Sequence, residues 1–275
     1  MIGNMEVIDS HCHVYPEKIA ARACAGTDRF YGTTAAGNGT VAGLLEKCND
    51  GRIDRFLIHS VATTPAQVRS INEFIARCVA DDPKRLFGFG TLHPESQDIL
   101  GDFQHLLELG LKGVKLHPDI QAFKVDDYRC LKIYELCERN GIPILMHTGD
   151  YRYDYSNPNR VVPILKIYAG LTLIGAHLGG WSVWEEACEK MAGLPNLYVD
   201  CSSTFSFCHD LAKAKEWISR YGYDRVLFGT DYPMWDPVRE LDTFLSLNLG
   251  EKANRLILGE NAKRLFRLDE NHAAR

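Results

Sequence analysis

Eight short apolar runs recur along the chain, and segments with helical spacing separate them. Each run has the length and near-continuous hydrophobicity of a strand that is covered on both faces. Strands that alternate with helices predict βαβ units and a parallel sheet. The predicted strands are EVIDSHCHV from Glu6, RFLIHSVA from Arg55, LFGFGTLHP from Leu86, GVKLHPDI from Gly113, PILMHTGD from Pro143, LTLIGAHLGG from Leu171, LYVDCSST from Leu197 and VLFGTDYP from Val226.

The number of these units favours an α/β fold of the (β/α)8 TIM-barrel type. Eight units fit a closed barrel better than an open doubly wound sheet, and no Gly-rich dinucleotide fingerprint follows the first run. Such a barrel typically needs about 250 residues. We therefore predict a single domain over residues 1–275.

Composition excludes several classes of partner. The net charge is only −5, which gives no reason to expect nucleic acid or an anionic membrane as a partner. The N-terminal segment lacks a basic stretch followed by an apolar run, and the nine cysteines form no CxxC pair. We expect a cytoplasmic protein with reduced thiols that acts on a small molecule, and the sequence leaves a homo-oligomer open.

Polar residues stand at the carboxyl ends of the predicted strands. They are His11 and His13, Lys115 and His117, His147, His177, and Asp231. Side chains two apart in a strand point to the same side, so each of the two pairs is expected to face the barrel lumen near its mouth, where barrel enzymes place their sites. The same alternation would point Cys12 away.

A metal site explains this convergence. Burying several imidazoles and a carboxylate is costly unless they are paired or bind a metal. Imidazole nitrogen together with carboxylate oxygen suits zinc, with nickel, iron or manganese as alternatives. A single histidine at a strand end is more often structural, and we interpret His59 and His93 in that way.

The same residues carry a family resemblance. The opening DSHCH resembles the D-x-H-x-H of the amidohydrolase superfamily. The segments MHTGD, AHLGG, FGTDYP and GENAKRLF resemble its amidohydrolase-2 branch, the TIM-barrel metal-dependent hydrolases. The resemblance runs from Asp9 to Phe266, almost the full chain.

The resemblance implies roles for these residues. His11, His13, His147 and Asp231 would hold one divalent metal, most often zinc. His177 would polarise a scissile carbonyl or help to move protons, and in a binuclear site it would be a ligand as well. Asp231 would take a proton from metal-activated water and pass it to the leaving group.

Lys115 and His117 have alternative roles. In binuclear relatives, a carbamylated lysine on the fourth strand bridges two metals. If Lys115 is carbamylated, then His147 and His177 would hold a second metal. Otherwise Lys115 grips an anionic substrate group or forms a structural salt bridge, and His117 contacts substrate at the rim.

Two long connections leave the carboxyl ends of strands. One runs from Val14 to about Arg55 and the other, YRYDYSNPNR, follows His147. Long loops at this position are more often functional than incidental. The predicted substrate-binding residues are Tyr151, Arg152, Arg160 and Trp181, because arginine pairs with carboxylates in a bidentate manner. The alternative is a solvated loop.

Three functions fit these features. We expect hydrolysis of a C–N or C–O bond in a small amide, lactone or ester. Non-oxidative decarboxylation or hydration of an unsaturated acid, by the same metal shell, is the alternative. A non-catalytic binding barrel is the third, although such relatives usually lose ligands and here all five positions are filled.

Overall fold

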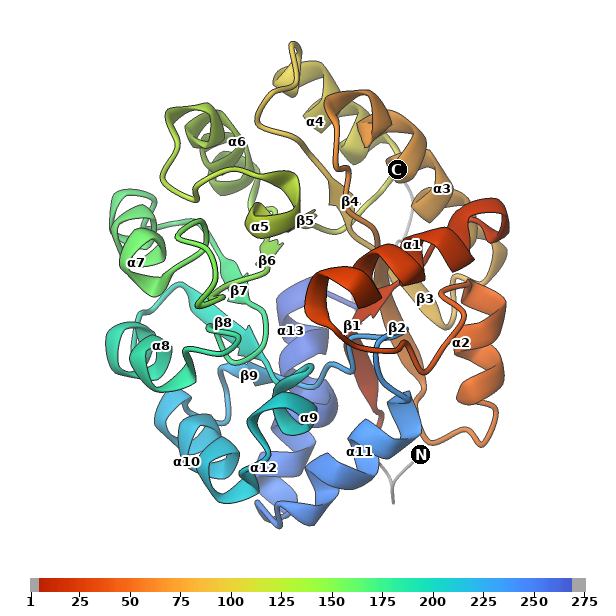
Figure 1. Ribbon diagram of the computed structural model, residues 1–275, viewed down its shortest axis with the longest axis vertical. Coiled ribbons are helices and arrows are strands. Elements are labelled where there is room, and N and C mark those ends of the chain that lie inside the picture. The colour runs from red at the N-terminus through yellow and green to blue at the C-terminus, as the bar shows by residue number, and fades with distance from the viewer. Residues whose placement is uncertain (1–4, 269–275) are drawn as a thin grey trace.

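The computed structural model describes residues 5–268, and its parallel strands surround one central axis (Figure 1). They form two sheets in the orders β1-β2-β3 and β4-β5-β6-β7-β8-β9. The strands are β1 (Ile8–His13), β2 (Arg55–His59), β3 (Leu86–Gly88), β4 (Gly90–Thr91), β5 (Val114–Leu116), β6 (Ile144–Met146), β7 (Leu173–Gly175), β8 (Leu197–Asp200) and β9 (Val226–Leu227).

Backbone hydrogen bonds close the two sheets into one barrel. Between β1 and the end of β9, the Ser10 amide donates to the Phe228 carbonyl at 2.8 Å and the Asp231 amide donates to the His11 carbonyl at 2.9 Å. β3 and β4 are the two halves of the third predicted run, interrupted at Phe89, whose amide bonds to β2. The predicted (β/α)8 barrel is therefore confirmed.

Helices surround the strands. They are α1 (Glu17–Tyr31), α2 (Val41–Lys47), α3 (Val68–Asp81), α4 (Ile99–Glu108), α5 (Pro118–Gln121), α6 (Leu131–Asn140), α7 (Pro158–Ile167), α8 (Trp184–Met191), α9 (Thr204–Cys208), α10 (Leu211–Tyr221), α11 (Pro237–Ser246), α12 (Glu251–Arg255) and α13 (Asn261–Phe266). Short 3-10 turns, η1 (Pro65–Gln67) and η2 (Tyr128–Cys130), precede α3 and α6, and a π-helical turn, η3 (Leu256–Glu260), joins α12 to α13. None of the helices in the described part of the chain has both the length and the apolar character that a membrane span needs.

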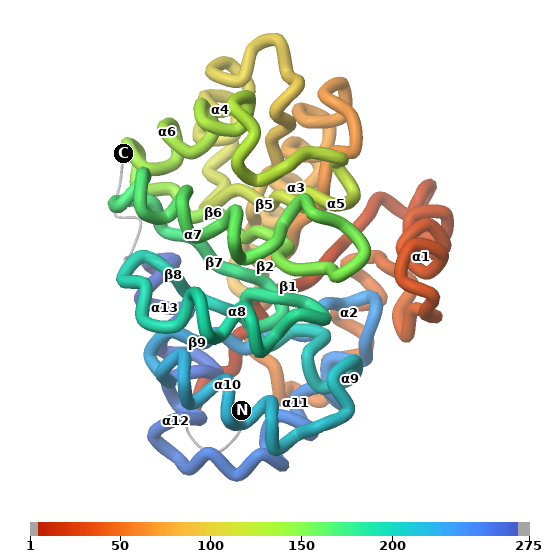
Figure 2. The backbone as a smooth tube through the Cα atoms, turned by 60° about the vertical axis from the view of Figure 1, so that its left-hand side comes forward, coloured from red at the N-terminus to blue at the C-terminus, as the bar shows by residue number. Residues whose placement is uncertain are grey.

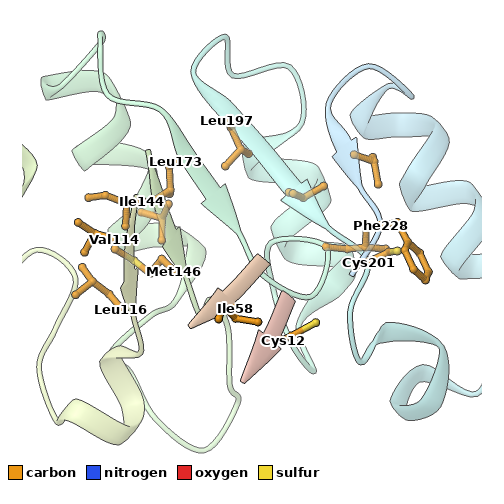
Figure 3. Close-up of a cluster of buried hydrophobic side chains, with 14 of the residues drawn as sticks. Cys12, Ile58, Val114, Leu116, Ile144, Met146, Leu173, Leu197, Cys201 and Phe228 are labelled. Carbon is orange, nitrogen blue, oxygen red and sulfur yellow. The ribbon is translucent and has the colours of Figure 1, made fainter. Parts of the chain in front are cut away.

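Alternation along the strands divides the core in two. The inner cluster fills the lower lumen with residues such as Leu57, Leu145 and Ile174, and Phe266 of α13 closes it from below. The outer cluster lies between strands and helices, and Figure 3 shows part of it. Because successive side chains point to opposite faces, β2, β6 and β7 each contribute to both clusters.

A bulge in β1 sets which residues face the site. The pairing of β1 with β2 shifts between Asp9 and Cys12. Ile8 lies in the inner cluster, while Cys12 lies in the outer cluster, as Figure 3 also shows. An uninterrupted strand would have placed both on one face, so the bulge turns His11 and His13 inward.

The first long connection carries α1, which stands apart from the ring of other helices in Figure 2. The helix ends at Gly32, whose φ of 69° is the left-handed conformation that glycine adopts without strain. Residues on one side of α1, including Ile19, Ala23 and Tyr31, line a cavity that also reaches the strand ends. The connection that the sequence marked as functional is thus part of the cavity wall.

Candidate metal centre and its cavity

Three side chains from β1 and the loop after β9 meet at one point. His11 Nε2 and His13 Nε2 lie 3.2 Å apart, and Asp231 Oδ1 lies 3.3 Å from the first and 3.4 Å from the second. Burial holds the pKa of both imidazoles well below the ordinary value, so both rings are neutral and present a lone pair. Neutral imidazole is the form that binds metals.

These separations fit a metal ion. Nitrogen and oxygen ligands lie about 2.0–2.2 Å from zinc in a tetrahedral shell, which places neighbouring ligand atoms roughly 3.3–3.5 Å apart. The three observed distances lie within about 0.1 Å of that range. The arrangement of His11, His13 and Asp231 therefore suits a divalent metal without rearrangement of the ligands.

Asp200 at the end of β8 orients His11. Its Oδ2 lies 2.9 Å from His11 Nδ1, and both side chains are fully buried. A carboxylate accepts, so Nδ1 of His11 carries the proton and Nε2 keeps its lone pair toward His13 and Asp231. Such a carboxylate behind a histidine ligand is a recurrent feature of metal sites. The sequence prediction missed Asp200.

Two further residues orient Asp231. The Trp235 Nε1–H donates to Ser203 Oγ at 2.8 Å, and Ser203 Oγ–H donates to Asp231 Oδ2 at 2.5 Å. Because indole only donates, the direction of this chain is fixed. The hydrogen bond from Ser203 occupies Oδ2 of Asp231 and leaves its Oδ1 facing Nε2 of His11 and of His13. Sequence reasoning missed Ser203, which follows β8 and carries no motif.

His147 and His177 form an adjoining pair. His147 Nδ1 lies 3.1 Å from His177 Nε2, and His177 Nδ1 lies 3.0 Å from the Ser202 carbonyl oxygen. The carbonyl only accepts, so His177 Nδ1 carries the proton and His147 Nδ1–H donates to His177 Nε2. The His177 ring stacks at 5.2 Å from that of His11, so the pair lies beside the three-ligand point.

The predicted ligand roles of this pair remain predictions. Buried His147 Nε2 has no hydrogen-bond partner, and Asp119 Oδ2 is 3.6 Å away. His117, Asp119 and His147 form one further buried group of metal-binding atoms, and His11, His177 and Asp200 form another. His59, interpreted above as structural, forms a third group with His11 and His13, and neither of its buried ring nitrogens has a partner.

Lys115 lies fully buried at the base of the cavity. Its Nζ is 3.2 Å from His11 Nε2, and burial lowers its pKa to about 8. The side chain lines the cavity together with His13 and Asp231. The predicted inward direction of Lys115 is therefore observed, while its carbamylation and a second metal remain predictions.

The cavity above these residues has a volume of about 730 Å³. Its walls come from α1, from α3 and from the strand-end loops. Apolar members include Ile19, Ala23, Ile71, Phe74 and Met234, and His13 and Asp231 of the metal centre line the same cavity. This is the composition of a small-molecule site, mostly apolar with a few convergent polar groups.

The predicted substrate-binding residues lie elsewhere. Tyr151, Arg152, Arg160 and Trp181 are absent from the lining of this cavity. Arg160 binds Asp126 and Asp154, and Tyr151 is 75% exposed. The two arginines bind carboxylates of nearby loops, and substrate binding by these four residues remains a prediction.

Arg152 and Trp181 instead support the end of α1. Arg152 pairs with Asp150 at 2.7 Å and its Nη1–H donates to the Phe30 carbonyl at 2.6 Å. The Trp181 ring lies 5.1 Å from that of Tyr31. These contacts attach the cavity wall to the barrel.

Three residues of the site adopt a left-handed backbone conformation. His177 has a φ of 59° and Asp231 a φ of 61°, and Ser203 has a φ of 57°. Residues other than glycine adopt this left-handed conformation rarely, and such residues cluster at functional sites. The surrounding hydrogen bonds described above hold these side chains in place.

Comparisons with known proteins agree with this architecture. A family model described as Amidohydrolase matches residues 8–268. A 2-amino-3-carboxymuconate-6-semialdehyde decarboxylase from Dictyostelium discoideum is 25% identical over 240 residues, which is 73% of this chain and 66% of that protein. The chain therefore spans just under two thirds of the length of this curated relative.

Solved structures share the fold over nearly their whole length. An uncharacterised TIM-barrel protein from Bordetella bronchiseptica has a TM-score of 0.81 at 24% identity, covering 96% of this chain and 99% of that one. A putative 2-pyrone-4,6-dicarboxylic acid hydrolase from Pseudomonas putida has a TM-score of 0.68 at 18% identity, covering 97% of this chain and 99% of that one. A dihydroxybenzoic acid decarboxylase from Polaromonas, solved with bound manganese and the inhibitor 2-nitroresorcinol, has a TM-score of 0.71 at 18% identity. The match covers 96% of this chain and 98% of that one.

Proposed function

This chain belongs to the amidohydrolase family, and on that premise we propose that it is a metal-dependent decarboxylase of a small unsaturated or aromatic carboxylic acid. The observation that carries the proposal is the three-ligand point at the floor of a largely apolar cavity. An apolar site disfavours the concentrated charge of a carboxylate and favours the dispersed charge that develops as CO2 leaves. The similarity to a curated decarboxylase supports this choice over hydrolysis, the function expected first from the sequence.

His11, His13 and Asp231 would hold the metal. Its donor set of two imidazole nitrogens and one carboxylate oxygen suits zinc or manganese. When bound, the ion supplies a Lewis acid that polarises substrate oxygen atoms. Zinc follows from the sequence prediction, and manganese is supported by its presence in the related Polaromonas decarboxylase.

The other side chains would bind the acid and move one proton. Lys115 presents a buried cation to the cavity and would attract the anionic substrate. Loss of CO2 leaves an electron pair on carbon, which must take up one proton so that R–CO2⁻ and H⁺ become R–H and CO2. Asp231 lines the cavity beside the shared ligand point, and its carboxylate would relay this proton from water to the carbon. His177 would assist in that transfer.

Hydrolysis is the second candidate, because the Pseudomonas neighbour is named as a putative hydrolase of a cyclic ester dicarboxylate. In that reaction Asp231 would act as base, and His177 would polarise the carbonyl after exchanging one of its ring-nitrogen partners, Ser202 or His147, for the substrate. The metal centre and the cavity are compatible with this chemistry as well. The products distinguish the two reactions, since only one of them releases CO2.

The experiment measures CO2 and ring opening in parallel. Protein loaded with zinc or with manganese is incubated with unsaturated and aromatic carboxylic acids and with lactones. We expect CO2 in stoichiometric amount with the product, loss of activity on chelation and recovery on adding metal back. Lactone opening without CO2 would favour the hydrolase, and full activity in metal-free protein would contradict both proposals.

Asp231→Asn changes a proposed metal ligand and the proposed proton-transfer group together, so metal content is measured beside turnover. We expect at least a 100-fold lower kcat, because general acid–base catalysis contributes about 10²–10⁴-fold. An Asp231→Asn protein with full turnover would overturn the assigned proton transfer.

The mass of the wild-type protein tests the carbamylation of Lys115. A carbamylated lysine would raise that mass, and the increase would be located at Lys115.

A further inference from the structure

One polar group in the cavity wall has no role so far. Tyr31 ends α1, and its Oη lies 2.9 Å from Nε2 of His117. Both residues line the cavity. Within residues 5–268, the Tyr31 hydroxyl forms its one hydrogen bond with His117. The direction of that bond decides what Tyr31 can do.

The position of His117 fixes the direction. His117 is the N-cap of α5, and its Nδ1 accepts the Ile120 backbone N–H at 3.3 Å. A backbone N–H can only donate, so Nδ1 carries the lone pair. An imidazole whose Nδ1 accepts a hydrogen bond carries its single proton on Nε2. His117 therefore donates to Tyr31 Oη.

The hydroxyl hydrogen of Tyr31 is consequently left for another acceptor. Burial raises the Tyr31 pKa well above its usual value, and Asp119, Asp231 and Asp150 add to that effect. The phenol thus keeps its proton at physiological pH and can only donate with it. No protein oxygen in the described part of the chain takes this hydrogen.

We propose that Tyr31 donates a hydrogen bond to an oxygen atom of the bound substrate, and that His117 is the positioning residue that fixes the direction of this bond. The inference rests on the proposed function, since it places substrate in this cavity. It defines a substrate class with oxygen atoms at two places. One oxygen group faces the metal centre, and a second acceptor, a carbonyl, phenolate or further carboxylate, faces α1.

Tyr31 is held in place before substrate binds. The Arg152 guanidinium lies 5.2 Å from the Tyr31 ring and its Nη1–H binds the carbonyl of the preceding residue, Phe30. The Trp181 ring covers another edge at 5.1 Å. A donor positioned in this way contributes binding energy without the cost of ordering its side chain. Arg152 and Trp181, two of the four residues predicted as substrate contacts, thus act through Tyr31.

The tautomer of His117 tests the first half of the proposal without any substrate. Long-range ¹H–¹⁵N correlation spectra of protein with ¹⁵N-labelled histidine report which ring nitrogen carries the proton. We expect Nε2–H at His117, identified by the loss of that signal in His117→Asn. A proton on Nδ1 would overturn the inferred direction, whatever the activity of the protein.

Binding of a probe tests the second half. The probe is 2-nitroresorcinol, which carries several acceptor oxygens, titrated into protein loaded with manganese. We expect the Kd to rise about tenfold or more in Tyr31→Phe, as for loss of a hydrogen bond to an anionic acceptor. Tyr155→Phe makes the same chemical change outside the cavity lining and is expected to leave the Kd unchanged.

His117→Asn separates positioning from folding. Asparagine is among the best N-cap residues, so its side-chain oxygen can keep the Ile120 contact while the donor to Tyr31 is lost. We expect an unchanged melting temperature and a Kd between those of wild type and Tyr31→Phe. A Kd equal to that of wild type would show that His117 does not position the phenol.

Metal content and CO2 release, measured on the same samples, separate the two proposals. Tyr31→Phe protein that binds metal and binds the probe as tightly as wild type would overturn this inference and leave the decarboxylase proposal intact. A wild-type protein that binds no metal would overturn the decarboxylase proposal. The spectra would still show which ring nitrogen of His117 carries the proton, because that experiment needs no metal and no substrate. Metal-loaded wild type that does not bind the probe would also contradict the donor role.

Discussion

At the scale of single residues, the metal centre depends on the carboxylate that holds the ring of a predicted ligand, His11. Asp200 fixes the proton of His11 on Nδ1 and so aims the Nε2 lone pair. We predict that Asp200→Asn lowers the affinity for zinc or manganese by about 10–100-fold, the usual cost of losing such a partner. Competition with a chromophoric chelator measures the affinity.

Asp102→Asn is the matched control for that change. Asp102 is also a buried carboxylate, but it lies in α4, where it binds Arg69 and Ser96. Its substitution should alter stability and leave metal affinity unchanged. Equal affinities for wild type and Asp200→Asn would mean that His11 is oriented by other contacts.

The residues of the site differ in how visible they are in the sequence. His11, His13 and Asp231 could be predicted because strand ends of a parallel barrel meet at one mouth, so position and residue type suffice. Asp200 gives the same signal at the end of LYVD and could have been found by the same rule. Tyr31 could not be predicted in this way, because its position depends on how the long connection after β1 folds back over the barrel.

At the scale of elements, α1 stands apart from the other helices in Figure 2, yet its last turn is bonded to the barrel through the Phe30 carbonyl. We predict that Arg152→Met loosens this turn, because the ion pair to Asp150 and the bond to the Phe30 carbonyl are lost together. Amide hydrogen exchange in residues 17–31 should accelerate at least tenfold, and KM should rise.

Arg129→Met is the matched control for the element. Arg129 binds Asp127 through the same contacts that Arg152 makes to Asp150, again two residues apart, but its remaining bond goes to Glu95. Exchange in α1 should therefore not change in this variant. Equal protection of α1 in both variants would show that Arg152 does not hold it.

Elements were predictable where one physical rule dominates. The eight apolar runs became strands because parallel barrel strands are buried on both faces. The third run splits into β3 and β4 at Phe89, which the run of apolar letters does not reveal. The loop after His147 was expected to contact substrate, but arginine affinity for carboxylates is satisfied there by Asp150, Asp126 and Asp154.

At the scale of the whole molecule, stability depends on acids that the barrel buries. Glu240 of α11 is 4% exposed, and burial raises its pKa from 4.5 to about 7. A raised pKa means that the folded state prefers the neutral carboxyl. The corresponding stability is present below pH 4.5 and is lost as the pH rises through about 7.

We therefore predict that Glu240→Gln makes the protein less sensitive to alkaline pH. Glutamine carries no charge at any pH, so the difference in unfolding free energy between variant and wild type should shift in favour of the variant from pH 5 to pH 8. The shift should approach about 3 kcal/mol, from roughly 1.4 kcal/mol for each pKa unit. Denaturant unfolding of chelator-treated protein at both pH values measures it, because chelation removes the separate pH dependence of metal binding.

The comparison between the two pH values isolates the charge from other effects of the substitution. Buried Oε2 of Glu240 has no hydrogen-bond partner, so an amide at that position adds a cost that is the same at both pH values. Glu251→Gln, at a side chain that is 79% exposed, should show no such shift. If Glu240→Gln and wild type lose stability in parallel between pH 5 and pH 8, then Glu240 is charged in the fold throughout, and a cation or solvent must reach it.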